Sequence, residues 1–347
     1  MKSPESSNQF ADVRERFHDN RITVVYNANA GIFKKDPIQA LWFKHKLNVM
    51  NTLLSGSDFF DFDVNMTPTT SIAHANDVVD AAIDAGHGAI IPIGGDSTVG
   101  RVAHRIALAK ETKADPKPRL IIVGGGTQNV LKSEITNQKD IVKATVDLFV
   151  NGKEVYVDLG VVRANNKDVP FAINAGIGMD AIMLDTWEQG GKGSRVDIFW
   201  HFLKDRHNIK PVDLHVFDTL EEIDQIFESV SAMPIVNGGK YGIFPITNSN
   251  MTDGRVESVV LPSHLKEGEH LMHLLTTSLR ANKSFEGAHY MGLQNATIKD
   301  INGDEVIFQC DGDPHRAGSD EINVFTMRRA VPMMTTNADS STLANVA

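Results

Sequence analysis

Short apolar runs alternate with amphipathic stretches through the first half of the chain. The runs are rich in Val and Ile and end in small or turn-forming residues, a pattern typical of buried strands. Strands are expected at Arg21–Tyr26, Asp61–Met66, Gly88–Ile93 and Arg119–Val123. Helices are expected at Pro37–Leu54, Ser71–Gly86, Thr98–Lys110 and Asn137–Val150. Strands that alternate with helices predict an α/β domain whose parallel sheet is covered on both faces.

The helix expected at Ser71–Gly86 has a recognisable start and stop. Ser71 is a residue type that caps helix N-termini, and Gly86 is a residue type that ends helices. Between them, Ile72, Val79 and Ile83 share one helical face.

The pattern changes after about Gly152, where short strands separated by turns predominate. These strands are expected within Glu154–Ala164, Val169–Ala175, Val212–Phe217, Met233–Ile246, Arg255–Leu261 and Tyr290–Phe325. Helices are expected only near Met179–His207 and Lys266–Ala281. This half therefore predicts a mainly antiparallel β domain.

We expect four segments along the chain. Residues 1–20 are expected to be a flexible N-terminus, 21–151 the α/β domain, 152–334 the β domain, and 335–347 a flexible tail. At 347 residues the chain exceeds the usual size of one hydrophobic core, which favours two domains.

Composition narrows the classes of protein. Cys310 is the single cysteine, which excludes an intramolecular disulfide and a multi-cysteine zinc site and fits a reducing compartment. Met1–Asn20 lacks the apolar core of a signal peptide, and no run of about 18 apolar residues occurs. A cytoplasmic location without a transmembrane segment is expected. The net charge of −10 argues against general nucleic-acid binding.

Three glycine-rich turns follow predicted parallel strands, at Asn27–Gly31, Gly94–Thr98 and Gly124–Asn129. The carboxyl ends of such strands meet at one edge of the sheet, where open α/β folds bind ligands. Glycine lets the backbone approach a phosphate, and a helix N-terminus favours its charge. A nucleotide site at this edge is therefore expected, although tight turns need glycine for structural reasons as well.

Acidic residues in two turns are candidates for catalysis. Asp96 lies between glycine and hydroxyl residues, so it can hold magnesium, accept a proton, or simply cap the helix near Thr98. Asp311 and Asp313 flank Gly312 in a turn that also fits the tip of a β-hairpin. Both structural alternatives stay open at this point.

Gly176–Ala181 competes with this interpretation because it fits the dinucleotide fingerprint G-x-G-x-x-A. However, it lies outside the alternating region, and no second parallel strand ending in an acid follows it. The Walker pattern, the G-x-S-x-G elbow and the H-E-x-x-H zinc motif are all absent from the sequence.

The ordered set of turns resembles the diacylglycerol kinase catalytic family, which includes bacterial lipid kinases, sphingosine kinases and ceramide kinases. In the first half, Asn27–Gly31, Gly94–Thr98 and Gly126–Asn129 resemble the family's N-P-x-S/A-G, G-G-D-G-T and G-T-x-N-D loops. In the second half, Asn174–Ala181, Thr252–Arg255 and Asp311–Asp313 resemble its G-x-G-x-D-A, D-G-x-L/V and D-G-E segments. The resemblance spans about residues 21 to 330. It implies that the dinucleotide-like segment is a family element of the β domain and no dinucleotide site.

The resemblance implies an ATP domain of the NAD kinase/diacylglycerol kinase type and a C-terminal β-sandwich that accepts lipid. Mg²⁺ would assist transfer of the γ-phosphate of ATP to a lipid hydroxyl of diacylglycerol, a sphingoid base or ceramide. The residues it assigns to ATP are Asn27, Gly31, Gly94, Gly95, Thr98, Gly126, Thr127 and Asn129. It makes Asp311 the catalytic base, Asp96 the alternative base or a metal ligand, and Asp313 a further metal ligand.

The implied partner is a lipid at a membrane surface, which gives a cytoplasmic protein peripheral contact with the inner membrane. Homodimer formation stays open. Because the chain is acidic, a local apolar or basic surface would have to provide the docking.

Several positions depart from the family pattern. Ser97 replaces a glycine, which would strain the loop if that position needs a positive φ, and Gly100-Arg101 stands where Asn-Glu is common. Val130 replaces an aspartate, and Asp313 is one methylene shorter than the usual glutamate. A lipid- or nucleotide-binding pseudokinase is therefore one alternative. A soluble-metabolite kinase such as NAD kinase is another, because NAD kinases and phosphofructokinases share the G-G-D-G loop.

Overall fold

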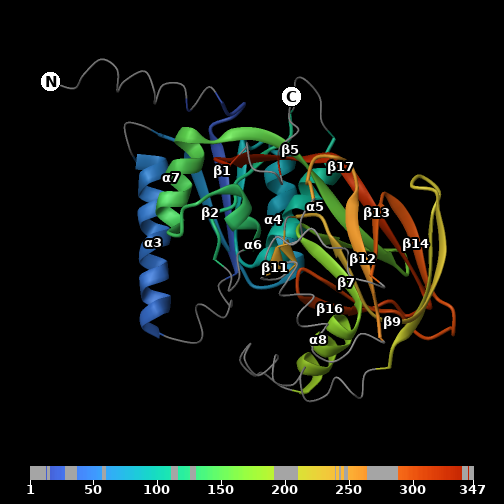
Figure 1. Cartoon of the computed structure of the whole chain (residues 1–347). Coiled ribbons are helices and arrows are strands. Elements are labelled where there is room, and N and C mark those ends of the chain that lie inside the picture. The colour runs from blue at the N-terminus through green and yellow to red at the C-terminus, as the bar shows by residue number, and fades with distance from the viewer. Residues whose placement is uncertain are drawn as a thin grey trace. The chain divides into compact units, whose positions relative to one another are not determined.

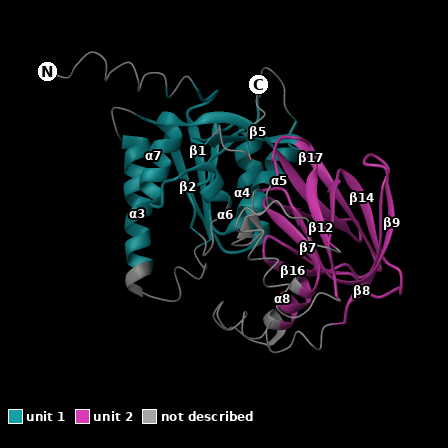
Figure 2. Cartoon of the chain, in the orientation of Figure 1, with its two compact units in different colours: residues 1–157, 329–347 teal, residues 158–328 magenta. Residues whose placement is uncertain are grey.

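The computed structural model describes most of the chain in two compact units. The described residues are 13, 16–27, 37–56, 60–110, 116–125, 130–190, 210–238, 240–241, 244–245, 249–263, 288–337 and 343. Unit 1 comprises Met1–Val157 and Arg329–Ala347, and unit 2 comprises Asp158–Arg328 (Figure 2).

Unit 1 is built on a parallel sheet with the strand order β2-β1-β3-β4-β17. Figure 1 labels β1, β2 and β17. The strands are β1 (Arg21–Asn27), β2 (Asp63–Thr69), β3 (Ala89–Ile93), β4 (Arg119–Leu120) and β17 (Glu321–Thr335). Every neighbouring pair in this order is parallel. The expected parallel sheet is therefore confirmed.

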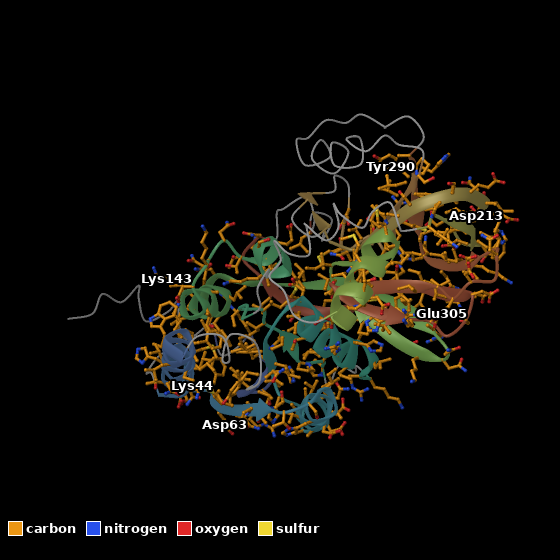
Figure 3. The ribbon with its side chains drawn as sticks, turned by 90° about the horizontal axis from the view of Figure 1, so that it is seen from below. Lys44, Asp63, Lys143, Asp213, Tyr290 and Glu305 are labelled. Carbon is orange, nitrogen blue, oxygen red and sulfur yellow. The ribbon has the colours of Figure 1, made fainter. Side chains whose placement is uncertain are left out.

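Helices connect these strands. They are α3 (Pro37–Gly56), α4 (Ile72–Asp84), α5 (Asp96–Leu108), α6 (Val130–Ile135) and α7 (Ile141–Asn151). Ser71 caps α4 as expected, its hydroxyl accepting a hydrogen bond from the His74 N–H at 3.1 Å. Lys44 on α3, Lys143 on α7 and Asp63 at the start of β2 mark these elements in Figure 3. None of the described helices has the length and hydropathy needed to span a bilayer.

The helix expected at Asn137–Val150 is wrong in its start. Asp140 caps α7 by accepting hydrogen bonds from the backbone N–H groups of Val142 and Lys143, at 2.9 and 3.2 Å. An N-cap residue has non-helical backbone angles, so the helix cannot continue through it toward Asn137.

The residues expected to form flexible ends include several that pack into unit 1. Phe17 is buried, with its ring centroid 5.2 Å from that of Phe149, and Arg16 donates hydrogen bonds to the Val150 and Gly152 carbonyls. At the other end, Thr335 is fully buried, and its hydroxyl donates to the Ile135 carbonyl at 2.9 Å. These residues thus contact unit 1, and the flexibility expected for the two ends stays a prediction.

Unit 2 is dominated by antiparallel strand pairs. Its strands are β5 (Lys153–Ala164), β6 (Lys167–Phe171), β7 (Asn174–Gly178), β8 (Val212–Asp218), β9 (Ile223–Val236), β10 (Lys240–Tyr241), β11 (Phe244–Pro245), β12 (Val256–Pro262), β13 (His289–Leu293), β14 (Asn295–Asp300), β15 (Ile307–Cys310), β16 (Asp313–Arg316) and the first part of β17. The main order is β16-β15-β7-β9-β8-β14-β17, and all six neighbouring pairs within it are antiparallel. The antiparallel pairing agrees with expectation, while the two layers of a β-sandwich stay a prediction.

Helices contribute little to the described part of unit 2. Helix α8 (Met179–Gly190) follows β7 and covers the first part of the helix expected at Met179–His207. The rest of that helix and the one expected at Lys266–Ala281 lie outside the described residues.

The chain passes between the units twice, within β5 and within β17. The boundaries at Val157/Asp158 and Arg328/Arg329 differ from the expected ones because the last part of β17 belongs to unit 1. There Met333 pairs with Leu120 of β4. Residues 329–334, which we expected in the β domain, thus fall in unit 1 of this division, and the functional domain limits stay a prediction.

Gly160 provides a test of packing in unit 2. It lies opposite the fully buried Phe171, and an added Cβ would overlap the Phe171 ring. We expect Gly160→Ala to lower the free energy of unfolding by about 1–3 kcal/mol, because an overpacked core must shift. The measurement is urea unfolding followed by circular dichroism.

Gly56→Ala is the matched control for this substitution. A Cβ at Gly56 would meet Thr52 at 3.9 Å, an ordinary contact, so a change within about 0.5 kcal/mol is expected. Equal urea midpoints for Gly160→Ala and the wild type would contradict the packing argument.

Candidate active site

Three strands of unit 1 end level with one another. In the parallel register, Tyr26 of β1 pairs with Ile93 of β3, and Asn27 pairs with Thr69 of β2. Asn27 is exposed at this carboxyl edge. The register thus brings the expected nucleotide residue Asn27 to the edge at which the turn after β3 begins.

The turn after β3 is tightly packed. Gly95 occupies the N-cap position of α5 but has no side chain with which to cap the helix. Its carbonyl accepts hydrogen bonds from the Thr98 and Val99 N–H groups, at 3.0 and 3.1 Å. A Cβ on Gly94 would lie 2.6 Å from the Thr98 hydroxyl oxygen. The N-terminus of α5 therefore lies against a backbone without side chains, a geometry suited to a phosphate group.

The turn after β4 contacts the turn after β3. Gly124 and Gly125 have φ values of +88° and +139°, which favour glycine. A Cβ on Gly125 would lie 2.7 Å from Ile93 Cγ2 and 3.1 Å from the Gly94 nitrogen. Two of the three glycine-rich turns are thus packed together at the edge of the sheet.

Asp96 joins the same two segments. It is the first residue of α5, and its Oδ1 accepts a hydrogen bond from the Leu131 N–H in the first turn of α6, at 3.3 Å. The alternative that Asp96 caps its own helix is wrong, because Gly95 occupies the cap position. Asp96 instead binds the N-terminal turn of the next helix.

Ser97 does not strain the backbone of this loop. Ser97 lies within α5 and is not among the described residues with positive φ, so its side chain fits the helical backbone. Gly31, Gly126, Thr127 and Asn129 lie outside the described residues, as does the side chain of Val130. The nucleotide roles of all these residues stay predictions.

In unit 2, Asp311 and Gly312 form the turn between β15 and β16. Cys310 and Asp313 are paired across it, and both turn residues have positive φ, +49° and +85°. This is the geometry of a two-residue hairpin turn with an Asp-Gly sequence. The hairpin interpretation of the Asp311–Asp313 segment is therefore confirmed.

The Asp311 carboxylate holds the link between β6 and β7. Its oxygens accept hydrogen bonds from three consecutive backbone N–H groups, those of Ala172 (2.8 Å), Ile173 (3.0 Å) and Asn174 (3.1 Å). A carboxylate offers about four lone-pair sites, so backbone N–H groups engage most of those on Asp311. Asp311 thus has a structural role, with limited room for a catalytic one.

A buried amide pair supports this turn. The Gln309 Nε2 donates to Asn174 Oδ1 at 3.0 Å, and the Gly312 N–H donates to Gln309 Oε1 at 2.9 Å. Asp313, the proposed metal ligand, is half-buried at the start of β16.

Sequence reasoning did not single out two buried acids of unit 2. Asp158 is fully buried and accepts a hydrogen bond from the Gly254 N–H at 2.5 Å. Glu257 is also largely buried, on β12. The sequence did hold a signal for these two acids, because each directly follows a valine within an apolar run expected to form a strand.

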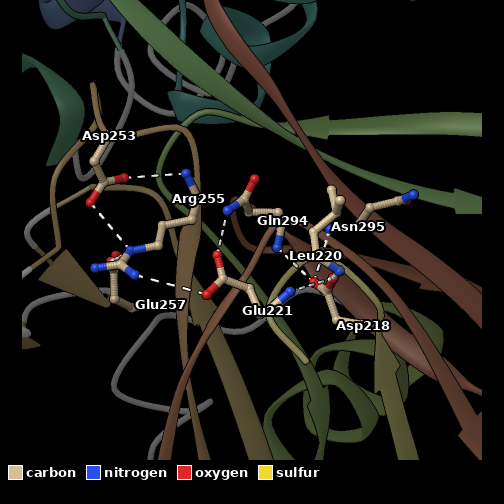
Figure 4. Close-up of polar contacts among 8 residues, drawn as sticks. All are labelled: Asp218, Leu220, Glu221, Asp253, Arg255, Glu257, Gln294 and Asn295. Carbon is tan, nitrogen blue, oxygen red and sulfur yellow. Dashed lines mark hydrogen bonds and ion pairs between the residues drawn. The ribbon is translucent and has the colours of Figure 1, made fainter. Parts of the chain in front are cut away.

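Burial raises the pKa of Glu257 to about 7. The nearby Ser249 hydroxyl lowers this pKa, Asp253 raises it, and Arg255 lowers it, but the effect of burial prevails. Figure 4 shows Arg255 beside both acids, with its Nε 3.6 Å from Asp253 Oδ2 and 3.8 Å from Glu257 Oε1. Glu257 therefore exchanges its proton near neutral pH, as general acids and bases do.

Within the described part of the chain, no three His, Cys, Asp or Glu side chains come together as a metal site. Asp96 belongs to unit 1 and Asp313 to unit 2. A magnesium site made from both stays a prediction.

Comparisons with known proteins agree with this architecture. Residues 21–162 match the family model "Diacylglycerol kinase catalytic domain". This match confirms, over residues 21–162, the family resemblance expected from the sequence motifs. No curated protein matches the chain at a significant level.

Solved structures show the same fold. One, assigned as a diacylglycerol kinase from Bacillus anthracis str. Sterne, is 17% identical, with a TM-score of 0.66, and the match covers 92% of this chain and 99% of that one. A second diacylglycerol kinase structure from the same organism is 18% identical, with a TM-score of 0.61 and coverage of 92% and 98%. At these identities the likeness establishes the fold.

The dinucleotide interpretation of Gly176–Ala181 is wrong. The segment lies on β7 and the start of α8, and β7 pairs antiparallel with β9 and β15. A dinucleotide fingerprint needs a parallel βαβ unit, which this strand does not belong to.

Asp96 and Asp311 should respond differently to the change from Asp to Asn. The Oδ1 of an asparagine can still accept the hydrogen bond from the Leu131 N–H, so Asp96→Asn should change the free energy of unfolding by at most about 0.5 kcal/mol. At Asp311 an amide NH₂ group would face at least one backbone N–H. We therefore expect Asp311→Asn to lower stability by about 1–3 kcal/mol, measured by urea unfolding.

Asp304→Asn is the control for the loss of a carboxylate in unit 2. Asp304 is exposed and has no hydrogen bond or ion pair with the described residues, so its substitution should be neutral. Equal stability of Asp311→Asn and Asp304→Asn would show that the three backbone contacts contribute nothing.

Glu257 should make stability depend on pH. Between pH 4.5 and about 7 the folded protein keeps a proton that the unfolded chain has lost, so wild-type stability falls as pH rises through this window. Relative to Glu257→Gln, the fall should be on the order of 3 kcal/mol between pH 4.5 and about 8. Urea midpoints of both proteins across this range provide the measurement.

Glu228→Gln, at an exposed position on β9, is the control, and its stability should follow the wild type at every pH. A pH-independent difference between the wild type and Glu257→Gln would contradict the raised pKa.

Proposed function

We propose that this protein is an ATP-dependent lipid kinase that transfers the γ-phosphate of ATP to a lipid hydroxyl. One observation carries the proposal: Gly125 packs against Ile93 and Gly94 at the carboxyl edge of a parallel sheet, within the range that matches the kinase family. This edge is where open α/β folds bind nucleotides.

The described residues at this edge fit a nucleotide. Gly94 and Gly95 leave backbone uncovered at the N-terminus of α5, and the hydroxyl of Thr98 lies over Gly94. We propose that these residues and the exposed Asn27 hold the phosphates of ATP, together with Gly31, Gly126, Thr127 and Asn129. Mg²⁺, when bound, would neutralise phosphate charge, and Asp96 and Asp313 are its proposed ligands.

Asp311 is proposed to receive the proton of the acceptor hydroxyl. The hydroxyl oxygen forms the new P–O bond, its proton passes to the carboxylate, and ADP leaves. The acceptor is a diacylglycerol, a sphingoid base or a ceramide, bound by unit 2 at the inner surface of a membrane.

A non-catalytic binding protein is the second candidate. The hydrogen bonds from Ala172, Ile173 and Asn174 give Asp311 a structural task that would persist without catalysis. Such a protein would bind ATP and lipid but leave both unchanged.

Phosphate transfer from ATP to a panel of micellar lipids, with Mg²⁺ present and NAD as a soluble acceptor, tests the proposal. Asp96→Asn is the better blank, because Asp311→Asn is expected to lose stability. We expect Asp96→Asn to reduce lipid phosphorylation by about 100-fold or more, since it removes a carboxylate proposed to hold the Mg²⁺ that would neutralise phosphate charge. The measured quantity is labelled lipid product per unit time.

Asp84→Asn, an exposed position at the last turn of α4, is the matched control and should retain wild-type activity. ATP binding without phosphorylation of any lipid would favour the non-catalytic candidate. Phosphorylation of NAD alone would assign the protein to the soluble-metabolite kinases.

A further inference from the structure

A pocket with a volume of about 330 Å³ lies in unit 2. It is lined by Arg163, Leu220, Gly254, Gln294, Asn295, Phe325, Thr326 and Arg328. Two arginines face it, and no Asp or Glu is part of its lining. None of the residues proposed above to bind ATP, magnesium or the acceptor hydroxyl lines it either.

Arg328 contributes a positive charge that no described residue neutralises. It is exposed, and it makes no hydrogen bond or ion pair with any residue that the structure describes. Its guanidinium lies over Gly254, where an added Cβ would overlap the Arg328 Nε. The missing side chain at Gly254, which also has a φ of +85°, leaves the space that Arg328 occupies.

Arg163 is held in place and keeps one donor free. Its Nε and Nη2 donate to the two oxygens of Asp168, at 2.6 and 2.9 Å, and its guanidinium lies 4.8 Å from the centre of the Phe325 ring. Its Nη1 has no partner among the described residues. A guanidinium fixed in this way can donate a hydrogen bond to an anion without losing further side-chain freedom.

Two neutral side chains add further hydrogen-bonding capacity. The Thr326 hydroxyl is buried without a hydrogen-bond partner in the described structure, which is costly unless a ligand or water fills the position. The side-chain amide of Asn295 likewise has no hydrogen-bond partner among the described residues. The backbone N–H groups of Gln294 and Asn295 are fixed by Asp218 Oδ2, at 2.7 and 2.9 Å, so this wall is rigid.

The neighbouring carboxylates are already paired. Figure 4 shows that Glu221 accepts from the Gln294 side chain and lies 4.0 Å from Arg255. Asp253 also lies beside Arg255, at 3.6 Å. These acids therefore leave Arg328 and the free edge of Arg163 without a protein anion.

We infer that this pocket binds a phosphate group, either free or in the headgroup of a lipid. Guanidinium N–H groups, an amide and a hydroxyl are the donors that bind phosphate oxygens, and arginine forks match their geometry. The exposed Leu220 and the Phe325 ring provide an apolar flank beside the donors. The inference does not depend on kinase activity, because it rests on the unpaired donors of unit 2 alone.

The test uses the full-length protein without ATP. Calorimetric titration with inorganic phosphate at constant ionic strength is the first arm. Sedimentation with phosphatidylcholine vesicles, with and without phosphatidic acid, is the second. We expect Arg328→Gln to weaken binding by about tenfold or more, because it removes a charge-assisted hydrogen bond. Thr326→Val should weaken it as well, and it gives a second readout if Arg328→Gln does not fold.

Arg329→Gln is the matched control, since it removes the same charge from the next residue of the same strand without altering the pocket lining. Binding of inorganic phosphate that Arg328→Gln weakens and Arg329→Gln retains supports a site for free phosphate. The same pattern only with phosphatidic acid supports a lipid headgroup. Absence of binding in both arms, equal binding by the wild type and Arg328→Gln, or equal sedimentation with phosphatidylcholine alone overturns the inference.

Discussion

The close approach of two glycine-rich turns determines the arrangement at the carboxyl edge of unit 1. Gly125 lies so near Ile93 and Gly94 that a side chain at position 125 would overlap the turn after β3. Because the turns touch, the first residue of α5 reaches the first turn of α6, and Asp96 bonds to Leu131. A single steric constraint thus places two helix N-termini beside one another, which concentrates their partial positive charge at one place.

In unit 2, buried or half-buried carboxylates hold distant segments of the chain in place. Asp158, Asp218 and Asp311 each accept hydrogen bonds from backbone N–H groups of segments distant in the sequence. A carboxylate can satisfy several N–H groups that would otherwise lack partners where strands end, and it does so without adding secondary structure. Acidic residues in this unit are therefore fold determinants first, which explains why their presence alone is weak evidence of catalysis.

The sequence predicted the elements of unit 1 better than the contacts of unit 2. Apolar periodicity and the cap at Ser71 are local signals, and they located the strands and α4 closely. The first part of β9, Ile223–Ser229, was missed because its residues are mostly exposed and lack an apolar run. The bond from Asp311 to Ala172 joins residues 139 positions apart, and no local pattern reports such a separation.

The return of the chain to unit 1 also bears on how the protein folds during synthesis. Residues 21–162 match the kinase family, yet Met333 pairs with Leu120, and Thr335 bonds to Ile135. This edge of β4 therefore stays unpaired until the segment around Met333 has been synthesised. An uncovered strand edge invites pairing with other chains, so the segment that carries the family match is by itself an incomplete folding unit that is prone to aggregation.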